Sequence, residues 1–343
     1  MENPFSLSFG KSPKESIERP VPKNEILDSF CAEAINQQIY MITGVRGAGK
    51  TVLMTEVSDR LKTDETWIVL ELNPESELLS DFASKLSSVK QCEEIFRSAR
   101  INLSFFGFGI EIKNEPQIHN LETAVSRMLE SLDKNGKRVL VTIDEVTDNS
   151  SMRSFSASFQ IFIRQRLPVF LLMTGLYENI DDLQNEKSLT FLYRAPKIYL
   201  AALNLTAIAS RYRSLFHLTK EEASKMALLT NGYPFAFQAL GYLTWQQKGN
   251  YKSVLDSYRL YLEDFVYDKL WSELSEKDRL VVHAIAESES GAVKEIMQIS
   301  GLAANELSPY RKRLIRKGIA DGSRRGYLSF TLPLFGEYVK DQI

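Results

Sequence analysis

The segment 40–51, Tyr-Met-Ile-Thr-Gly-Val-Arg-Gly-Ala-Gly-Lys-Thr, constrains the fold of this chain more than any other stretch. Its first glycine, four intervening residues and the final Gly-Lys-Thr have the spacing of a phosphate-binding P-loop. In such a loop the backbone N–H groups surround a polyphosphate, the lysine places its charge on the β- and γ-phosphates, and the threonine hydroxyl binds Mg²⁺. The predicted nucleotide-binding residues are Gly44, Val45, Arg46, Gly47, Ala48, Gly49, Lys50 and Thr51.

The segments before and after this loop indicate whether the motif is a true P-loop or a chance match. A P-loop connects a strand to a helix whose N-terminus adds a positive field at the phosphates. Here the apolar run 39–43 predicts the strand, and apolar residues at helical spacing over 51–62 predict the helix. We therefore interpret the motif as functional and expect an α/β fold.

Composition and charge narrow the class of protein. The 343 residues are 44% hydrophobic and 25% charged, as in ordinary soluble proteins, and the formal net charge of −2 gives no general attraction to nucleic acid or membrane. Two cysteines predict a reducing compartment rather than a disulfide framework, and three scattered histidines argue against a zinc site. The N-terminus lacks the pattern of a signal peptide, and no apolar run has membrane length. We expect a cytoplasmic protein.

A second candidate for chemistry lies at 138–146, Arg-Val-Leu-Val-Thr-Ile-Asp-Glu-Val. The apolar run predicts a buried strand that delivers Asp144 and Glu145 at its C-terminal end, where open α/β sheets bind ligands. Acids at strand ends are often only surface residues. After a P-loop, however, the first acid is the expected Mg²⁺ ligand and the second the base that activates water. The strand predicted at 169–174 ends in Thr174, a candidate contact of the γ-phosphate, although threonine also simply ends strands.

The alternation of strands and helices predicts a doubly wound parallel sheet in the first part of the chain. The expected strands are 39–43, 66–73, 138–146, 169–174 and 197–203. From Asn204 onward the pattern is helical, with a break at 231–234, Asn-Gly-Tyr-Pro, that composition alone would call a turn.

Two segments fall outside this alternation. Residues 1–25 are rich in Pro and Ser and predict an extended arm, followed by a helix at 24–35. The aromatic residues Phe5 and Phe9 lead us to expect that the arm packs on the next domain, near the place of an adenine. Residues 101–113 alternate in polarity and contain two glycines, which suggests an inserted β-hairpin. Its aromatic side chains either pack at the sheet edge, the favoured interpretation, or contact a partner.

The last seventy or so residues predict a separate module. Helical runs at 276–286, 293–299 and 303–317, followed by two short runs around 322–326, follow the plan of a winged helix-turn-helix. Basic residues gather on its third helix and at the wing tip, where such a module meets a phosphate backbone. A solvated face on a protein-interaction module is the alternative. The candidate nucleic-acid contacts are Arg311, Arg313, Arg316, Lys317, Arg324 and Arg325.

The order of these motifs resembles the AAA+ ATPases related to origin-recognition and replication-initiator proteins. The motifs are Gly-Val-Arg-Gly-Ala-Gly-Lys-Thr, Thr-Ile-Asp-Glu-Val, Met-Thr-Gly, Asn-Gly-Tyr-Pro and the C-terminal module. The resemblance implies an ATP site between a core and a helical lid, with Thr174 as γ-phosphate sensor. Two features of this chain differ from the pattern of the origin-recognition and initiator ATPases. The lid offers Gly232-Tyr233-Pro234, similar to the Gly-x-Pro signature of signal-transduction ATPases, with Pro234 at the nucleotide. Arg194 is a loosely aligned candidate for an arginine finger toward a neighbouring subunit.

These observations predict an arm (1–25), a nucleotide-binding core (26–203), a helical lid (204–272) and a winged helix (273–343). The expected activity is slow hydrolysis of ATP with Mg²⁺, with the nucleotide state coupled to double-stranded DNA binding and with self-association through the core. ATP is favoured over GTP because no Asn-Lys-x-Asp pattern is present. A signalling switch that retains its nucleotide and binds a protein partner is the alternative. A metabolic kinase is disfavoured, since no second substrate site is apparent.

Overall fold

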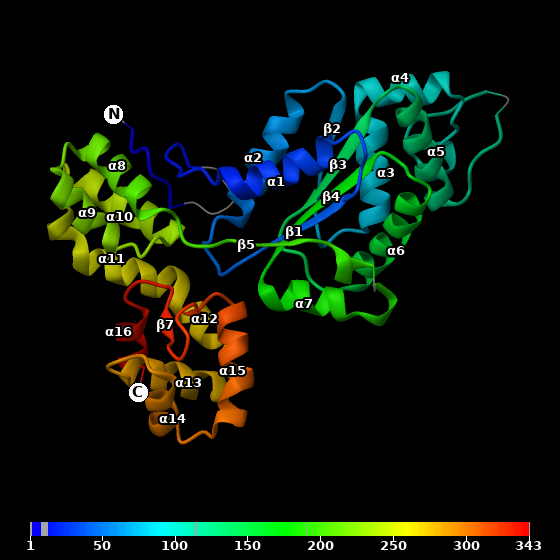
Figure 1. Cartoon of the computed structure of the whole chain (residues 1–343). Coiled ribbons are helices and arrows are strands. Elements are labelled where there is room, and N and C mark those ends of the chain that lie inside the picture. Colours follow the sequence, from blue (N-terminus) through cyan, green and yellow to red (C-terminus); the bar gives the residue numbers. More distant parts are fainter. Residues whose placement is uncertain (1, 8–12, 114, 190, 343) are drawn as a thin grey trace. The chain divides into compact units, whose positions relative to one another are not determined.

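Figure 1 presents the computed structural model, which describes residues 2–7, 13–113, 115–189 and 191–342. By their contacts, the residues form two compact units. The sheet unit comprises Pro20–Thr43 and Lys50–Tyr199, and the helical unit comprises Met1–Arg19, Gly44–Gly49 and Leu200–Ile343. In the described part of the chain, no helix has both the length and the apolar character needed to cross a membrane.

A five-stranded parallel sheet forms the centre of the sheet unit, as the sequence predicts. Its strands are β1 (Ile39–Thr43), β2 (Trp67–Leu72), β3 (Arg138–Ile143), β4 (Val169–Gly175) and β5 (Lys197–Tyr199), in the order β2-β3-β4-β1-β5. In this register Ile42 lies beside Thr174 and Ile143 beside Met173, so the C-terminal ends of β1, β3 and β4 are neighbours. Loops that follow these strands therefore meet at one edge of the sheet.

Helices pack on both faces of the sheet, because its strands are apolar on both sides. They are α1 (Pro20–Cys31), α2 (Lys50–Lys62), α3 (Leu78–Ser88), α4 (Lys90–Ser98), α5 (Leu121–Lys134), α6 (Ser150–Arg164) and α7 (Tyr177–Asn185). On one face Met41 and Val141 belong to a large core with Phe82 and Phe155 of α3 and α6. On the other face Phe30 of α1 lies against the ring of Phe170.

The first helix differs from the prediction in its bounds. The expected range 24–35 is wrong at both ends, because α1 begins at Pro20 and ends at Cys31. Proline is well suited to the first turn of a helix, where its missing N–H would have no helical partner in any case. Pro20 therefore starts the helix instead of prolonging the arm.

The predicted hairpin at 101–113 does not form. These residues contain a single turn of 3₁₀-helix, Ser104–Phe106, and no strand. One backbone hydrogen bond, from Leu103 N–H to the Ile110 carbonyl at 2.8 Å, crosses the loop. The Asn102 amide instead donates to the carbonyls of Ile112 and Glu115, which closes the segment without a ladder. Phe106 and Phe108 are partly buried against the core, whereas Phe105 is 53% exposed, and packing of these aromatic residues at the sheet edge stays a prediction.

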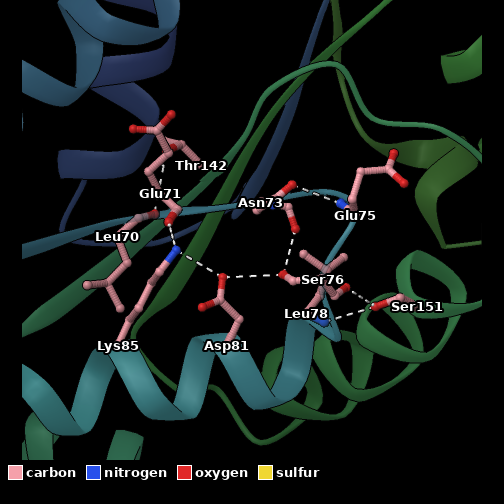
Figure 2. Close-up of polar contacts among 10 residues, drawn as sticks. All are labelled: Leu70, Glu71, Asn73, Glu75, Ser76, Leu78, Asp81, Lys85, Thr142 and Ser151. Carbon is pink, nitrogen blue, oxygen red and sulfur yellow. Dashed lines mark hydrogen bonds and ion pairs between the residues drawn. The ribbon is translucent and has the colours of Figure 1, made fainter.

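A polar network fixes the connection that follows β2, as Figure 2 shows. The Lys85 ammonium donates to the Glu71 carbonyl at 2.6 Å and lies 2.9 Å from the Asp81 carboxylate. The Ser151 hydroxyl, at the start of α6, accepts from Leu78 N–H at 2.9 Å and donates to the Ser76 carbonyl at 2.7 Å. These bonds join the beginnings of α3 and α6 and so hold the loops at this edge of the sheet.

The helical unit contains the later helices and a short antiparallel strand pair. Its elements are α8 (Leu205–Phe216), α9 (Lys220–Leu228), α10 (Pro234–Gln246), α11 (Leu255–Leu262), a π-helical turn (Glu263–Tyr267), α12 (Asp268–Ser272), α13 (Glu276–Glu287), α14 (Val293–Ser300), α15 (Ala304–Arg316), β6 (Ala320–Asp321), β7 (Ser329–Phe330) and α16 (Phe335–Lys340). Three helices, α13 to α15, thus precede the β6–β7 pair, in which Ala320 lies opposite Phe330.

The N-terminal arm packs within this helical unit. Phe5 is buried against the rings of Tyr212 on α8 and Phe237 on α10. The expectation that the arm packs on the domain next to it in sequence is therefore wrong for Phe5, whose partners lie some two hundred positions further along the chain. Phe9, on which part of that expectation rested, lies outside the described residues.

Candidate nucleotide site

The predicted P-loop lies between a strand and a helix, as its chemistry requires. β1 ends at Thr43 and α2 begins at Lys50, so Gly44–Gly49 is the connecting loop. Gly47 (φ +67°) and Gly49 (φ +85°) have the left-handed backbone conformation that turns a chain tightly. The Lys50 side chain is buried at the start of α2, where the helix N-terminus and the ammonium group together favour an anion.

Three side chains from neighbouring elements of the sheet unit meet at the edge of the sheet. The Thr51 hydroxyl donates to Asp144 Oδ2 at 2.8 Å, and the Thr174 hydroxyl donates to Asp144 Oδ1. Asp144 follows β3, Thr174 lies near the end of β4, and Thr51 belongs to α2. The order of the parallel strands brings Asp144 and Thr174 together, since β3 and β4 are adjacent and Ile143, the last residue of β3, lies opposite Met173.

This arrangement fits a magnesium ion. Mg²⁺ takes hard oxygen ligands and is usually held by one or two protein groups, with phosphate and water completing its octahedral shell. The Thr51 hydroxyl, at the start of the helix after the phosphate-binding loop, and the Asp144 carboxylate, just after β3, are oxygen ligands within hydrogen-bonding distance of each other. Thr51 and Asp144 are therefore the residues that would hold the ion.

Glu145 has a backbone conformation that is uncommon for its residue type. Its φ of +53° lies in the left-handed region, which glutamate rarely adopts. The Glu145 N–H donates to Asp144 Oδ1 at 3.1 Å and to the Thr174 hydroxyl at 3.2 Å, and the next N–H, of Val146, donates to the Thr174 carbonyl at 2.9 Å. Thr174 thus holds the backbone on both sides of Glu145, while the Glu145 side chain stays exposed at the sheet edge.

Two other predicted residues belong to other elements of the chain. Arg194 is an exposed residue at the end of the 3₁₀ turn Leu192–Arg194 in the sheet unit, and its role toward a neighbouring subunit stays a prediction. Pro234 is the first residue of α10 in the helical unit. Its missing N–H suits this first position, and its predicted contact with nucleotide also stays a prediction.

One of the predicted DNA contacts, Arg313, forms an ion pair within the C-terminal helices, and its contact with DNA stays a prediction. The Arg313 guanidinium binds the buried Asp278 carboxylate, with Nη2 at 2.6 Å and Nε at 2.9 Å from Oδ1, and so ties α15 to α13. The Arg311 Nε is also buried, and Arg324 lies over the Tyr327 ring with Cζ 3.7 Å from the centroid. Among the predicted basic contacts, the exposed residues are Arg316, Arg324 and Arg325.

Comparisons with families of known proteins give two matches within the chain. Residues 26–168 match a family described as an ATPase domain predominantly from Archaea, and residues 264–339 match a domain of unknown function (DUF8462). No curated protein matches the chain.

Two solved structures resemble the chain over nearly its whole length. The Walker-type ATPase of Pyrococcus abyssi is 15% identical with a TM-score of 0.68, and the likeness covers 95% of this chain and 96% of that one. The ORC2 protein of Aeropyrum pernix, solved in ADPNP and ADP complexes, is 14% identical with a TM-score of 0.54, over 93% of this chain and 89% of that one. At such identities the likeness establishes the fold. The chain therefore has the fold of these two structures, and its residues 26–168 are similar to the ATPase domain found predominantly in Archaea.

Proposed function

We propose that this chain binds ATP with Mg²⁺ and hydrolyses it slowly to ADP and phosphate. The observation that supports the proposal is the group formed by Thr51, Asp144 and Thr174 beside Glu145, whose backbone is left-handed; Thr51 lies in the first turn of the helix after the phosphate-binding loop. Hydrolysis by such a site depends on positioning and charge neutralisation more than on covalent chemistry. The test is ATP turnover by the purified protein, measured with and without duplex DNA.

Each residue has a distinct task in this mechanism. Lys50 supplies the positive charge that offsets charge on the β- and γ-phosphates during transfer. Glu145 is the base that accepts a proton from the attacking water, which then adds to the γ-phosphorus in line with the departing ADP. Thr174 keeps the Asp144 carboxylate and the Glu145 backbone in place through the bonds described above. A magnesium ion held by Thr51 and Asp144 would supply further charge neutralisation on the phosphates.

Dependence on the metal ion gives a direct test of Asp144. Chelation of Mg²⁺ with EDTA is expected to abolish turnover, and Asp144→Asn is expected to raise the Mg²⁺ concentration needed for half-maximal turnover, because an amide is a weaker ligand than a carboxylate. Asp133→Asn, an exposed acid on α5, is the matched control and should leave that concentration unchanged. An Asp144→Asn protein with unaltered Mg²⁺ dependence would remove Asp144 from the metal site.

The C-terminal helices and strand pair are proposed to bind double-stranded DNA. Three helices followed by an antiparallel pair have the order of a winged helix, and exposed arginines lie on the last of these helices and on the loop between the strands. The second candidate, a nucleotide-retaining switch with a protein partner, is favoured by Arg313, which is bound to Asp278 and reduces the basic surface. Nucleotide retained without turnover, unaffected by DNA, would favour this alternative.

Salt dependence distinguishes the two candidates. The affinity for duplex DNA is expected to fall with salt, and Arg324→Ala/Arg325→Ala is expected to lower it and to reduce the log–log salt slope by about 2, one for each lost phosphate contact. The matched control is Arg213→Ala/Lys220→Ala, which removes two exposed positive charges from α8 and α9. Fluorescence anisotropy at several salt concentrations measures both quantities. Binding that is absent or insensitive to salt would exclude the DNA candidate.

A further inference from the structure

Three consecutive carbonyl groups of the P-loop each accept a hydrogen bond from another part of the helical unit. The Tyr233 hydroxyl donates to the Arg46 carbonyl at 2.5 Å, and the Phe235 N–H donates to the Gly47 carbonyl at 3.2 Å. The Arg19 guanidinium donates to the Ala48 carbonyl at 3.3 Å through Nη2 and to the Ala201 carbonyl through Nη1 at 2.5 Å.

The direction of these carbonyls fixes the direction of the N–H groups that follow them. In a trans peptide the C=O of one residue and the N–H of the next point in opposite directions. When Tyr233 holds the Arg46 carbonyl on one side of the loop, the Gly47 N–H must point to the other side. The bond from Arg19 to the Ala48 carbonyl orients the Gly49 N–H in the same way. Inward N–H groups are what a P-loop uses to bind phosphate.

The two donors at the start of α10 are suited to this task. Pro234 has no N–H, so Phe235 provides the first N–H of the helix, which has no helical acceptor and is available to the loop. Burial raises the pKa of Tyr233 well above its usual value, which keeps its hydroxyl a neutral donor.

The fit between the loop and α10 is also close in space. Gly47 has φ +67°, and a Cβ atom there would lie 2.4 Å from the Tyr233 oxygen and 2.8 Å from Phe235 Cβ. Only glycine permits both the conformation and the approach.

The Ala48 N–H donates to the Val45 carbonyl at 3.2 Å within the loop. We propose that Tyr233, Phe235 and Arg19 form a clamp that holds the P-loop backbone with the N–H groups of Gly47 and Gly49 directed at the phosphates, which makes Tyr233 a positioning residue for nucleotide binding. The proposal rests on the proposed function and assigns the Gly232-Tyr233-Pro234 segment to the loop backbone rather than to the adenine. It predicts that loss of the Tyr233 hydroxyl weakens binding of every ligand that carries the polyphosphate, with or without a base.

The test compares two ligands and two tyrosines. Tyr233→Phe removes one hydroxyl and is expected to weaken binding of both ATP and inorganic tripolyphosphate about fivefold, the scale of one net hydrogen bond. The matched control is Tyr258→Phe, another buried tyrosine of the helical unit, whose hydroxyl donates to the Leu229 carbonyl at 2.9 Å. Tyr258→Phe should lower the free energy of unfolding about as much as Tyr233→Phe does, and it should leave the affinities for ATP and tripolyphosphate unchanged. Isothermal titration calorimetry measures the affinities, and thermal unfolding measures the stability.

Each result decides between distinct conclusions. Equal weakening for both ligands, in Tyr233→Phe alone, supports the clamp. Weakening for ATP but not for tripolyphosphate would overturn it in favour of a contact with the base, and unchanged affinity for both would overturn it outright. Should Tyr233→Phe fail to fold, Arg19→Lys keeps the charge but loses the two-pronged guanidinium, and the same comparison applies. A wild-type protein that binds neither ligand would refute the proposed function and the clamp together, whereas binding of both without an effect of either variant refutes only the clamp.

Discussion

Glu145→Gln is expected to leave ATP binding intact and to lower the rate of hydrolysis about 10²- to 10⁴-fold, the usual contribution of a positioned general base. The amide cannot accept the proton of the attacking water, yet it has nearly the size of the carboxylate. The backbone bonds that hold residue 145 come from its N–H and therefore survive the change. Single-turnover hydrolysis and equilibrium binding of ATP, measured on the same preparation, separate the two effects.

Two further variants serve as controls for the effect of Glu145→Gln on ATP binding and hydrolysis. Lys50→Ala is expected to lose binding and turnover together, because the lysine charge acts on the phosphates in the ground state as well as in the transition state. Glu71→Gln changes an exposed acid on β2 and should alter neither quantity, since Glu71 gives its carbonyl and not its carboxylate to the network of Figure 2. A Glu145→Gln protein with undiminished turnover would remove Glu145 from the mechanism.

Local sequence pattern is sufficient to predict the sheet and the arrangement of the motifs. The spacing of Gly44, Gly49 and Lys50 implies a strand before the loop and a helix after it, and both are present. The apolar run that precedes Asp144 forms a central strand, and the parallel order then brings Thr174 beside that acid. In each case a pattern within a short segment determines whether that segment is a strand or a helix, and the α/β fold then fixes its place.

Features that depend on contacts between distant residues could not be predicted. Alternating polarity at 101–113 indicates strands, but the Asn102 side chain competes for the carbonyls that a ladder would need. The left-handed backbone of Glu145 results from bonds to Thr174 on another strand. No sequence pattern identifies the Tyr233 hydroxyl as a partner of the P-loop, although Tyr233 lies in the Gly-Tyr-Pro segment that the sequence marks as a candidate nucleotide contact.

Arg313→Ala is expected to destabilise the C-terminal helices by about 2–3 kcal/mol, because it leaves the buried Asp278 carboxylate without its counter-charge. The Asp278 carboxylate is 2% exposed and would keep only Ser275, which caps α13 by donating to Asp278 Oδ2 at 2.6 Å and accepting from Asp278 N–H at 3.2 Å. Because the Arg313 side chain is 40% exposed, water partly replaces it, which places the expected cost below that of a fully buried pair. Urea denaturation and hydrogen exchange of α13 and α15 measure the effect.

The same variant decides whether Arg313 acts on DNA directly. Asp278→Asn/Arg313→Ala should recover part of the lost stability, since a neutral amide needs no counter-charge, and Lys312→Ala, an exposed neighbour on α15, should cost less than about 0.5 kcal/mol. If Arg313 is structural, Arg313→Ala weakens DNA binding without reducing the salt slope, and the double variant restores part of the affinity. A reduced salt slope in a protein of unchanged stability would instead make Arg313 a phosphate contact, because only a lost contact with the DNA backbone alters the number of counterions released.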